Sequence, residues 1–422
     1  MLDQSFTQKN LTDLIKGKYE TRFDINLTNN IDILLDEAEN NIRIESFDFF
    51  NIEKYNVNNK DFFRINSYIE TLIARKANDN IRRLYKVTQA DRGKIVDQVA
   101  TLLRDETPKS ILRLDIRSFY ESIPRDKILK KLNDDPLLSI KTKWVINTLF
   151  CNNHFVNNNG LPRGLGISAA LSEIFMRDFD KAIRTIPGVY YYARYVDDII
   201  IFTHSNKSIV IKNINDLLRN RFELELNNKK TTIDNDVECK CQQKCLCQRG
   251  NCKCNSICSC NKRNAETNNI DYLGYKFVFS KYPGNSNLKI LLADKKIKKI
   301  KTRIFKSFEQ YSYDNNFENL FLRIKFITGN HILNRGKNQN LNSGIYYNYC
   351  HINDKKDLIN LNAFLHYCIF DRKSYLGRKL NRKLKVKDKN KLKLLSFTFG
   401  FESKLTHNFK PETIKIIKEC WI

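Results

Sequence analysis

The chain has 422 residues, of which 73 are Lys or Arg and 47 are Asp or Glu, so its formal net charge at pH 7 is +26. Hydrophobic residues make up 41% of the sequence, enough for two or three lobes, because single cores stop growing at about 250 to 300 residues. The charge excludes an ordinary metabolic enzyme. The charged N-terminal segment lacks a secretory signal and no run of about 20 apolar residues could span a bilayer, so we expect a cytoplasmic protein without a membrane anchor.

The N-terminal part of the chain is polar and predicts mainly helices. Candidate helices cover residues 30–44, 61–76 and 91–105. A short apolar run at residues 110–116 follows and carries Asp115 near its end, before a helical pattern at 125–132. We therefore expect a strand that delivers this carboxylate to one end of a sheet.

The middle of the chain predicts a second acidic strand unit. A turn at 157–162 leads to an Ala-rich helix at 168–183, and residues 189–202 predict a hairpin with Asp197 and Asp198 at its tip. Burying two adjacent charges between apolar strands is costly without a cation. If both units lie in one sheet, their carboxylates meet, and without a His to act as a base they suit two Mg²⁺ ions and phosphoryl or nucleotidyl transfer.

Strands are also expected within residues 222–233 and 271–279, and the pattern from Leu291 to the end is largely helical.

Five blocks follow one another between about residues 80 and 280. They are Leu114–Ile123, Leu161–Glu173, Tyr195–Asp198, Leu226–Thr231 and Tyr272–Tyr275. In this order they resemble the blocks of a reverse transcriptase, namely the first catalytic block, the Gly loop with its helix, the Tyr-x-Asp-Asp box, the lysine block and the primer-grip turn. The resemblance implies an α+β right-hand polymerase that makes DNA on an RNA template or in an unconventionally templated way. It places fingers and palm at 1–284 and a basic helical thumb at 285–422.

The resemblance also implies how the acids act. Two catalytic Mg²⁺ ions would be held by Asp115, the neighbouring Ile116, Asp197 and Asp198. Lys230, or Lys229, would donate a proton to the leaving pyrophosphate; an exposed strand lysine is the alternative.

Substrate contacts are expected around the first two blocks. Tyr120 would lie next to the sugar, where its ring clashes with a 2′-hydroxyl and selects deoxynucleotides. Further candidates for nucleotide binding are Arg163, Gly164, Lys86 and Arg92. Arg163 stands where the family usually has Gln, a departure in the segment that positions the template base.

The amino-acid sequences of two blocks favour one subclass of reverse transcriptase. Phe119–Ile123 and Pro162–Ser168 resemble most the bacterial defence-associated reverse transcriptases of the abortive-infection and unknown-group clade, and among them the second subunit of the paired type 3 antiphage system. The resemblance implies an RNA or DNA template-primer, a non-coding RNA and a second reverse transcriptase subunit as partners in an oligomeric complex. A retron-type enzyme, an RNA polymerase and a catalytically silent nucleic-acid-binding scaffold are the alternatives.

A cysteine-rich insertion at 239–260 separates the lysine block from the primer-grip turn. Its two halves repeat one spacing, with thiols at Cys239, Cys241, Cys245, Cys247, Cys252, Cys254, Cys258 and Cys260. Sets of four thiolates favour tetrahedral Zn²⁺, so we expect about two ions rather than free thiols or disulfides. With few apolar residues, the insertion would fold only on its metals.

The positive charge is concentrated in the C-terminal part. From Lys281 onward there are 30 Lys and Arg against 11 Asp and Glu, a surplus of 19. A biased genome would raise Lys content everywhere, so this clustering favours a polyanion such as nucleic acid. We expect Arg378, Lys379, Arg382 and Lys383 to contact the phosphates of the nucleic acid.

Overall fold

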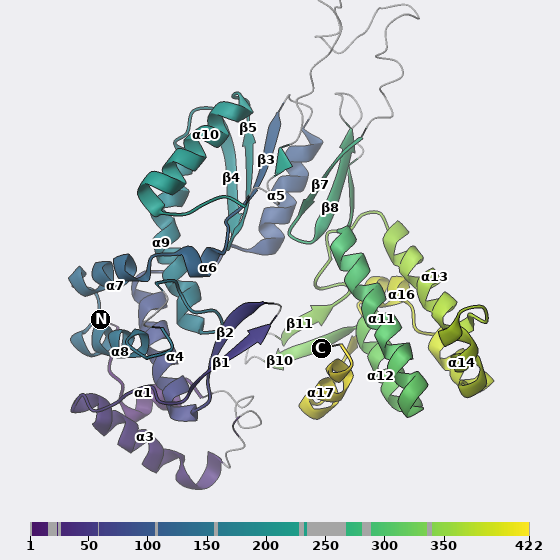
Figure 1. The fold of residues 1–422 in the computed structure, drawn as a ribbon, viewed down its shortest axis with the longest axis horizontal. Helices are drawn as coiled ribbons and strands as arrows, with labels where there is room; N and C mark the ends of the chain where they lie inside the picture. The colour runs from purple at the N-terminus through teal and green to yellow at the C-terminus, as the bar shows by residue number, and fades with distance from the viewer. Residues whose placement is uncertain are drawn as a thin grey trace, which may run out of the picture. The chain divides into compact units, whose positions relative to one another are not determined.

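The computed structural model describes residues 2–15, 23, 27–57, 59–105, 109–155, 159–227, 232–233, 267–280, 288–335 and 340–421 (Figure 1). The predictions for Lys229, Lys230 and the cysteine insertion lie outside these residues. The chain forms two compact units, the first from 1–91 with 109–236 and the second from 92–108 with 237–422. In the described part, no helix has both the length and the apolar character needed to cross a bilayer.

The N-terminal part of the first unit is helical around one hairpin. Its elements are α1 (Gln8–Thr12), α3 (Leu27–Arg43), β1 (Ile52–Val57), β2 (Lys60–Ile65), α4 (Tyr68–Leu84), α6 (Phe119–Ser122), α7 (Arg125–Asp134) and α8 (Ile140–Phe150). The helix expected over 61–76 is wrong at its start, because β2 pairs with β1. The following helix begins after Ser67, whose hydroxyl accepts from the backbone N–H of Glu70 as an N-cap.

The first unit also contains the acidic sheet. It consists of β3 (Ser110–Asp115), β4 (Val189–Tyr195), β5 (Asp198–Thr203) and β6 (Thr232–Ile233) in the order β4-β5-β3-β6, with antiparallel neighbours. The predicted strand and hairpin are thus confirmed as neighbours. Ile199 to Phe202 of β5 are fully buried, so both faces of this central strand are covered, because successive side chains point to opposite faces.

Three helical elements complete this part of the unit. They are α9 (Gly166–Arg184), α10 (Lys207–Leu217) and the π-helical turn η2 (Leu218–Phe222). α9 packs against α4 and β4, so it joins the N-terminal helices to the sheet.

The second unit combines a small sheet with helices. Its sheet has the order β7-β8-β9, from β7 (Thr267–Tyr272), β8 (Tyr275–Ser280) and β9 (Lys289–Leu292). Its helices are α5 (Arg92–Arg104), α11 (Asp294–Asp314), α12 (Phe317–Thr328), α13 (Lys356–Phe370), α14 (Tyr375–Lys383), α15 (Val386–Lys393), α16 (Phe397–Glu402) and α17 (Pro411–Glu419).

A second sheet in this unit was not expected from sequence. It joins β10 (Asn330–Arg335), β11 (Asn340–Gly344) and β12 (Thr406–His407) in the order β11-β10-β12. By its contacts α5 also belongs to this unit, so the boundary between the compact units does not coincide with the expected lobe boundary at 284. The division into fingers with palm and thumb stays a prediction.

Candidate active site

The three predicted acids come together at one end of the acidic sheet. Asp115 is the last residue of β3 and lies opposite Asp198, the first residue of β5. Asp197 is in the two-residue turn between β4 and β5, and its carbonyl accepts the backbone N–H of Ile116 at 3.3 Å. The sheet register therefore brings together residues far apart in the sequence.

Each of the two facing carboxylates has a neighbour that orients it. The side chain of Asn227 donates to Oδ2 of Asp115 at 3.0 Å, and its backbone N–H donates to the Asp115 carbonyl at 2.7 Å. Nη2 of Arg113 lies 3.4 Å from Oδ1 of Asp198. Asp115 is buried, with 3% of its surface exposed.

The donor set at this sheet end fits magnesium. Carboxylate and main-chain oxygens are the ligands that Mg²⁺ takes in proteins. Among the described residues, no three or more His, Cys, Asp or Glu side chains lie close enough together to hold a metal ion.

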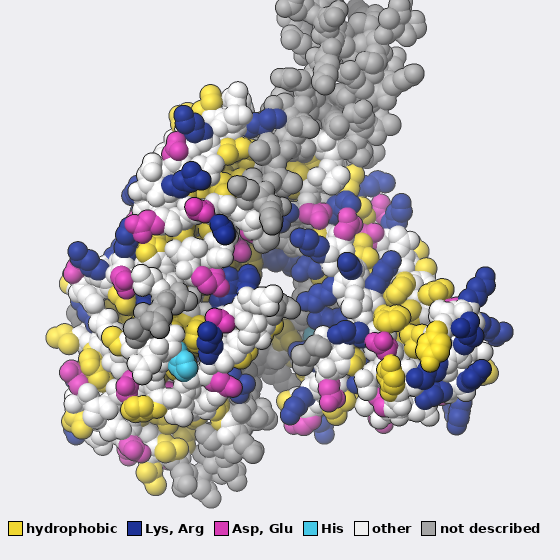
Figure 2. All heavy atoms as spheres, viewed as in Figure 1, with side chains coloured by type: hydrophobic (Ala, Val, Ile, Leu, Met, Phe, Trp, Pro, Cys, Tyr) yellow, Lys and Arg dark blue, Asp and Glu magenta, His cyan; other side chains and the backbone are white. Residues whose placement is uncertain are grey.

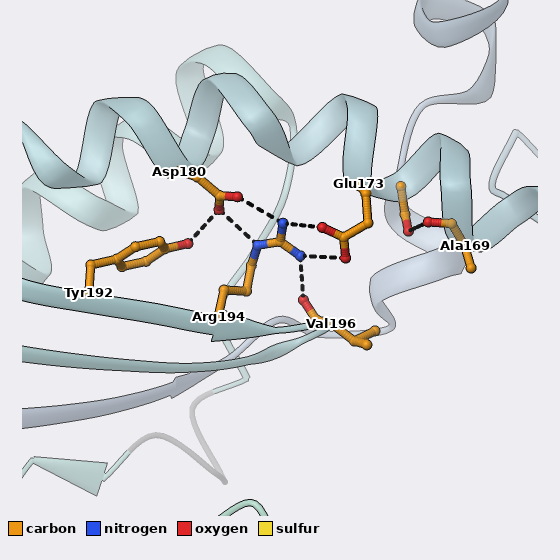
Figure 3. A network of polar contacts seen from close by, with 7 residues as sticks. Ala169, Glu173, Asp180, Tyr192, Arg194 and Val196 are labelled. Atoms are coloured by element: carbon orange, nitrogen blue, oxygen red, sulfur yellow. Dashed lines mark hydrogen bonds and ion pairs between the residues drawn. The ribbon is translucent and has the colours of Figure 1, made fainter. Parts of the chain in front are cut away.

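A buried ionic network lies behind the acidic turn (Figure 3). Arg194, whose side chain is 4% exposed, donates to both oxygens of Glu173 at 3.1 and 2.7 Å and to both oxygens of Asp180 at 2.8 and 2.9 Å. Its Nη1 also donates to the carbonyl of Val196 at 3.1 Å. The network therefore ties α9 to the turn that carries Asp197.

The same network shifts the ionisation of two side chains. Burial works against the charge on Arg194, but hydrogen bonds to Asp180 and Glu173 raise the pKa of its guanidinium. The hydroxyl of Tyr192 donates to Asp180 at 2.6 Å, and burial, with the Asp180 charge, raises the pKa of Tyr192 well above its ordinary value. Arg194 is thus charged and Tyr192 neutral at any physiological pH.

The predicted nucleotide-binding residues of the first two blocks lie together. Nη2 of Arg163 is 2.9 Å from Oε2 of Glu121, and its Nε contacts the other carboxylate oxygen. The guanidinium carbon lies 5.3 Å from the centre of the Tyr120 ring. Gly164 has φ +97°, and a Cβ there would lie 2.3 Å from the Phe63 carbonyl, so only glycine fits between the loop and β2.

Lys86 and Arg92 belong to other elements. Lys86 is exposed just after the end of α4. Arg92 belongs to the second unit, where it donates to the carbonyls of Leu273 at 2.5 Å and Asn348 at 2.8 Å. These contacts favour a structural role for Arg92 at the predicted primer-grip turn, and nucleotide binding by either residue stays a prediction.

The predicted phosphate-binding residues occupy α14, where Figure 2 shows Lys and Arg side chains gathered on the surface. Arg378 and Arg382 are exposed. Nζ of Lys379 lies 4.3 Å from the centre of the Tyr313 ring, and Nζ of Lys383 donates to the Ser312 carbonyl at 2.9 Å. The two lysines therefore also anchor α14 on α11.

Several residues of the site had no sequence prediction. They are Arg113, Glu121, Glu173, Asp180, Arg194 and Asn227. For most of them the only sequence signal is a place inside or next to a motif: Glu121, Glu173 and Asn227 lie within the blocks, and Arg194 directly precedes Tyr195. Asp180 gives no such signal, since only the register of α9 on β4 brings it under the turn.

Comparisons with known proteins identify the family of the chain. The family model "Reverse transcriptase (RNA-dependent DNA polymerase)" matches residues 57–277, more than half of the chain. No curated protein sequence matches this chain.

Solved structures of yeast telomerases are similar to the chain. One is apo telomerase from Candida tropicalis, with 11% identity and a TM-score of 0.34 over 96% of this chain and 60% of that one. Another is telomerase from Candida albicans in complex with a fragment of telomeric RNA, with 13% identity and a TM-score of 0.33 over 82% and 53%. The chain thus spans little more than half the length of these telomerase chains. From the family match, the chain belongs to the reverse transcriptase family, whose members are RNA-dependent DNA polymerases and thus nucleotidyltransferases.

Proposed function

We propose that this protein is an RNA-directed DNA polymerase that adds deoxynucleotides to a 3′-hydroxyl with the help of two Mg²⁺ ions. The observation that carries the proposal is the pairing of Asp115 with Asp198 beside the turn that holds Asp197. Three carboxylates at one sheet end form an oxygen-rich site beside apolar strands, which suits divalent cations and phosphate oxygens.

The residues have distinct roles in this proposal. Asp115, Asp197 and Asp198, with the carbonyl of Ile116, would hold the ions, which when bound polarise the phosphate and activate the 3′-hydroxyl. Asn227 and Arg113 orient two of these carboxylates. Lys230 would release a proton from its ammonium group to the leaving pyrophosphate.

The test is incorporation of labelled deoxynucleotides by the purified full-length protein. We expect Mg²⁺-dependent incorporation that disappears in the double variant Asp197→Ala with Asp198→Ala. Asp216→Asn, which removes an exposed carboxylate from α10 in the same unit, is the matched control and should keep full activity. Absence of incorporation by the unchanged protein with any template and primer would favour a nucleic-acid-binding scaffold instead.

Asp115→Asn separates chemistry from folding. The amide keeps the shape of the side chain but cannot neutralise a divalent cation. We expect an unchanged melting temperature and no activity. A large drop in melting temperature would mean that Asp115 has a structural role.

A role in antiphage defence is a further part of the proposal. It is supported by the resemblance of Phe119–Ile123 and Pro162–Ser168 to defence-associated reverse transcriptases, which also suggests a non-coding RNA and a second polymerase subunit as partners. Cells that carry the complete system should restrict phage plating, and the double aspartate variant should not. Sequencing of copurifying nucleic acid distinguishes this subclass from a retron, which would hold one dedicated RNA and its DNA copy.

A further inference from the structure

We propose that Arg163 and Glu121 form a clamp on the ring of Tyr120, and that this clamp sets how strictly the enzyme rejects ribonucleotides. The inference rests on the proposed function, because it assigns Tyr120 to the sugar of the incoming nucleotide. It makes Arg163 and Glu121 positioning residues, which act through Tyr120.

The first arm of the clamp is the ion pair between Arg163 and Glu121. Two nitrogens of the guanidinium face the two oxygens of one carboxylate, with Nη2 to Oε2 at 2.9 Å. The side chains are only 16% and 32% exposed, so the pair is partly shielded from water. A two-point contact of this kind fixes the plane and the direction of the guanidinium group.

The second arm is the contact of this guanidinium with the Tyr120 ring. Its central carbon lies 5.3 Å from the ring centre, within the range of a cation–π interaction. The ring of Phe119 meets Tyr120 edge to face at 5.2 Å. Burial, together with the nearby carboxylate of Glu173 on α9, raises the pKa of Tyr120, so its hydroxyl stays protonated. The ring is thus held from more than one direction.

The backbone holds both arms in register. The backbone N–H of Leu161 donates to the Tyr120 carbonyl at 2.8 Å, and the Arg163 carbonyl accepts the backbone N–H of Phe63 at 2.7 Å. A Cβ at Gly160 would lie 2.3 Å from the Glu121 carbonyl, so the loop follows the first block closely. These contacts fix the backbone positions from which both arms extend.

The clamp depends on having Arg rather than the family's usual Gln at position 163. A Gln at this position has a shorter side chain and no charge, so it could not both bind a carboxylate at two points and cover an aromatic ring. A ring free to turn leaves room for a 2′-hydroxyl, whereas a fixed ring excludes it.

The experiment measures sugar discrimination in Arg163→Gln and Glu121→Gln. For each variant, kcat/KM is compared for one deoxynucleotide and its ribonucleotide, and equilibrium binding of the same two nucleotides is measured in Ca²⁺, without turnover. We expect each variant to lower the preference for the deoxynucleotide at least tenfold in kcat/KM, with the binding ratio moving in the same direction. Because both act through one pair, the double variant should add little to either single variant.

Two controls make the result specific. Arg184→Gln removes another arginine that lies 5.3 Å over a tyrosine ring, that of Tyr192, and should leave the sugar preference unchanged. Tyr120→Ala should relax the preference at least as far as the clamp variants. Melting temperatures show whether each variant is folded.

The outcomes separate the two proposals. If DNA synthesis continues and Tyr120→Ala relaxes selection while both clamp variants keep the wild-type preference, the clamp is refuted. If the unchanged protein makes no DNA, the proposed function fails. The binding ratio then decides the clamp by itself, and equal ratios in the wild type and the clamp variants refute it.

Discussion

The turn between β4 and β5 shows how one residue can depend on a distant one. Val196 has φ +60°, a left-handed conformation that a β-branched residue adopts at a cost of about 1 to 3 kcal/mol. Its carbonyl accepts from Arg194, which two carboxylates of α9 hold in place. The buried network therefore stabilises the strained conformation that presents Asp197.

Removing the centre of this network should be costly. Arg194→Ala leaves Glu173 and Asp180 without their cation, so we expect the free energy of unfolding in urea to fall by about 3 to 5 kcal/mol, as for other broken buried ion pairs. Tyr192→Phe removes one hydrogen bond and should cost about 1 to 2 kcal/mol.

The matched control for this prediction is an exposed ion pair. Lys127 and Glu223 are 2.8 Å apart with both side chains more than half exposed, so Lys127→Ala should change the free energy by less than about 1 kcal/mol. Equal losses for Arg194→Ala and Lys127→Ala would contradict the stabilising role of the network.

At the scale of elements, the predicted primer-grip turn is the two-residue loop of the hairpin formed by β7 and β8. Leu273 and Gly274 both have positive φ, +47° and +86°, as in a type I′ turn, which matches the twist of the flanking strands. The Leu273 carbonyl accepts from Arg92 of α5, and the Gly274 carbonyl accepts from the backbone N–H of Ala293. The turn is therefore fixed from both sides within its own unit.

The glycine in this turn is open to a direct test. Gly274→Ala forces a Cβ into a left-handed position where Lys296 and Arg92 already lie at 3.1 and 3.3 Å, so we expect a loss of about 1 to 2 kcal/mol in the free energy of unfolding. Gly166→Ala is the control. Gly166 has no positive φ, and the nearest atom to its Cβ would be 3.8 Å away. A loss of similar size in both variants would argue against backbone strain at Gly274.

The sequence predicts those elements that depend on local patterns, and it does not predict contacts between distant parts of the chain. The acidic hairpin was predictable, because Ile199 to Phe202 form an apolar run and the acids sit beside the turn. The β1–β2 hairpin was missed because Phe62, Phe63 and Ile65 also fit a helical period, and only pairing with β1 decides between the two. The contacts of Arg194 with Asp180 and of Arg92 with Leu273 come from tertiary packing, so no local pattern indicates them.

At the scale of the whole molecule, the basic charge of the second unit predicts its binding to nucleic acid. Each phosphate neutralised releases counterions, so log affinity should fall linearly with log salt, with a slope of about −0.7 per contact for single strands and −0.9 for duplex. The exposed cations Arg378, Arg382, Lys385 and Lys387 are candidates for such contacts.

Changing these four residues to Gln should flatten the salt slope and weaken binding of all sequences alike, because phosphate contacts read no bases. Measurements of affinity by anisotropy at several salt concentrations give the slope. The double variant Lys379→Gln with Lys383→Gln is the comparison. Because these lysines contact α11, their replacement should lower the stability of the protein more than it flattens the salt slope. An unchanged slope in the fourfold variant would place the nucleic acid elsewhere.

The cysteine insertion leads to a prediction for the purified protein. Elemental analysis under reducing conditions should find about two Zn²⁺ ions per chain, because each half supplies four thiolates. Cys245→Ser and Cys254→Ser, one in each half, should each lower the content by about one ion. Four cysteines outside the insertion offer a control, and Cys151→Ser, at an exposed position, should leave the zinc content unchanged. Protein free of zinc would refute the assignment.

The route of the chain between its units affects how the protein is made. The chain leaves the first unit after Asp91, contributes α5 to the second, and returns to the first at Lys109. During synthesis, α5 leaves the ribosome early. The hydrogen bond from Arg92 to the carbonyl of Leu273 can form only after a further 181 residues have been added. Until the rest of the second unit has been made, we expect the apolar face of α5, which is buried in the finished protein, to be open to proteases. A fragment that starts at residue 237 would lack this helix, and a separate peptide of residues 92–108 should restore its folding.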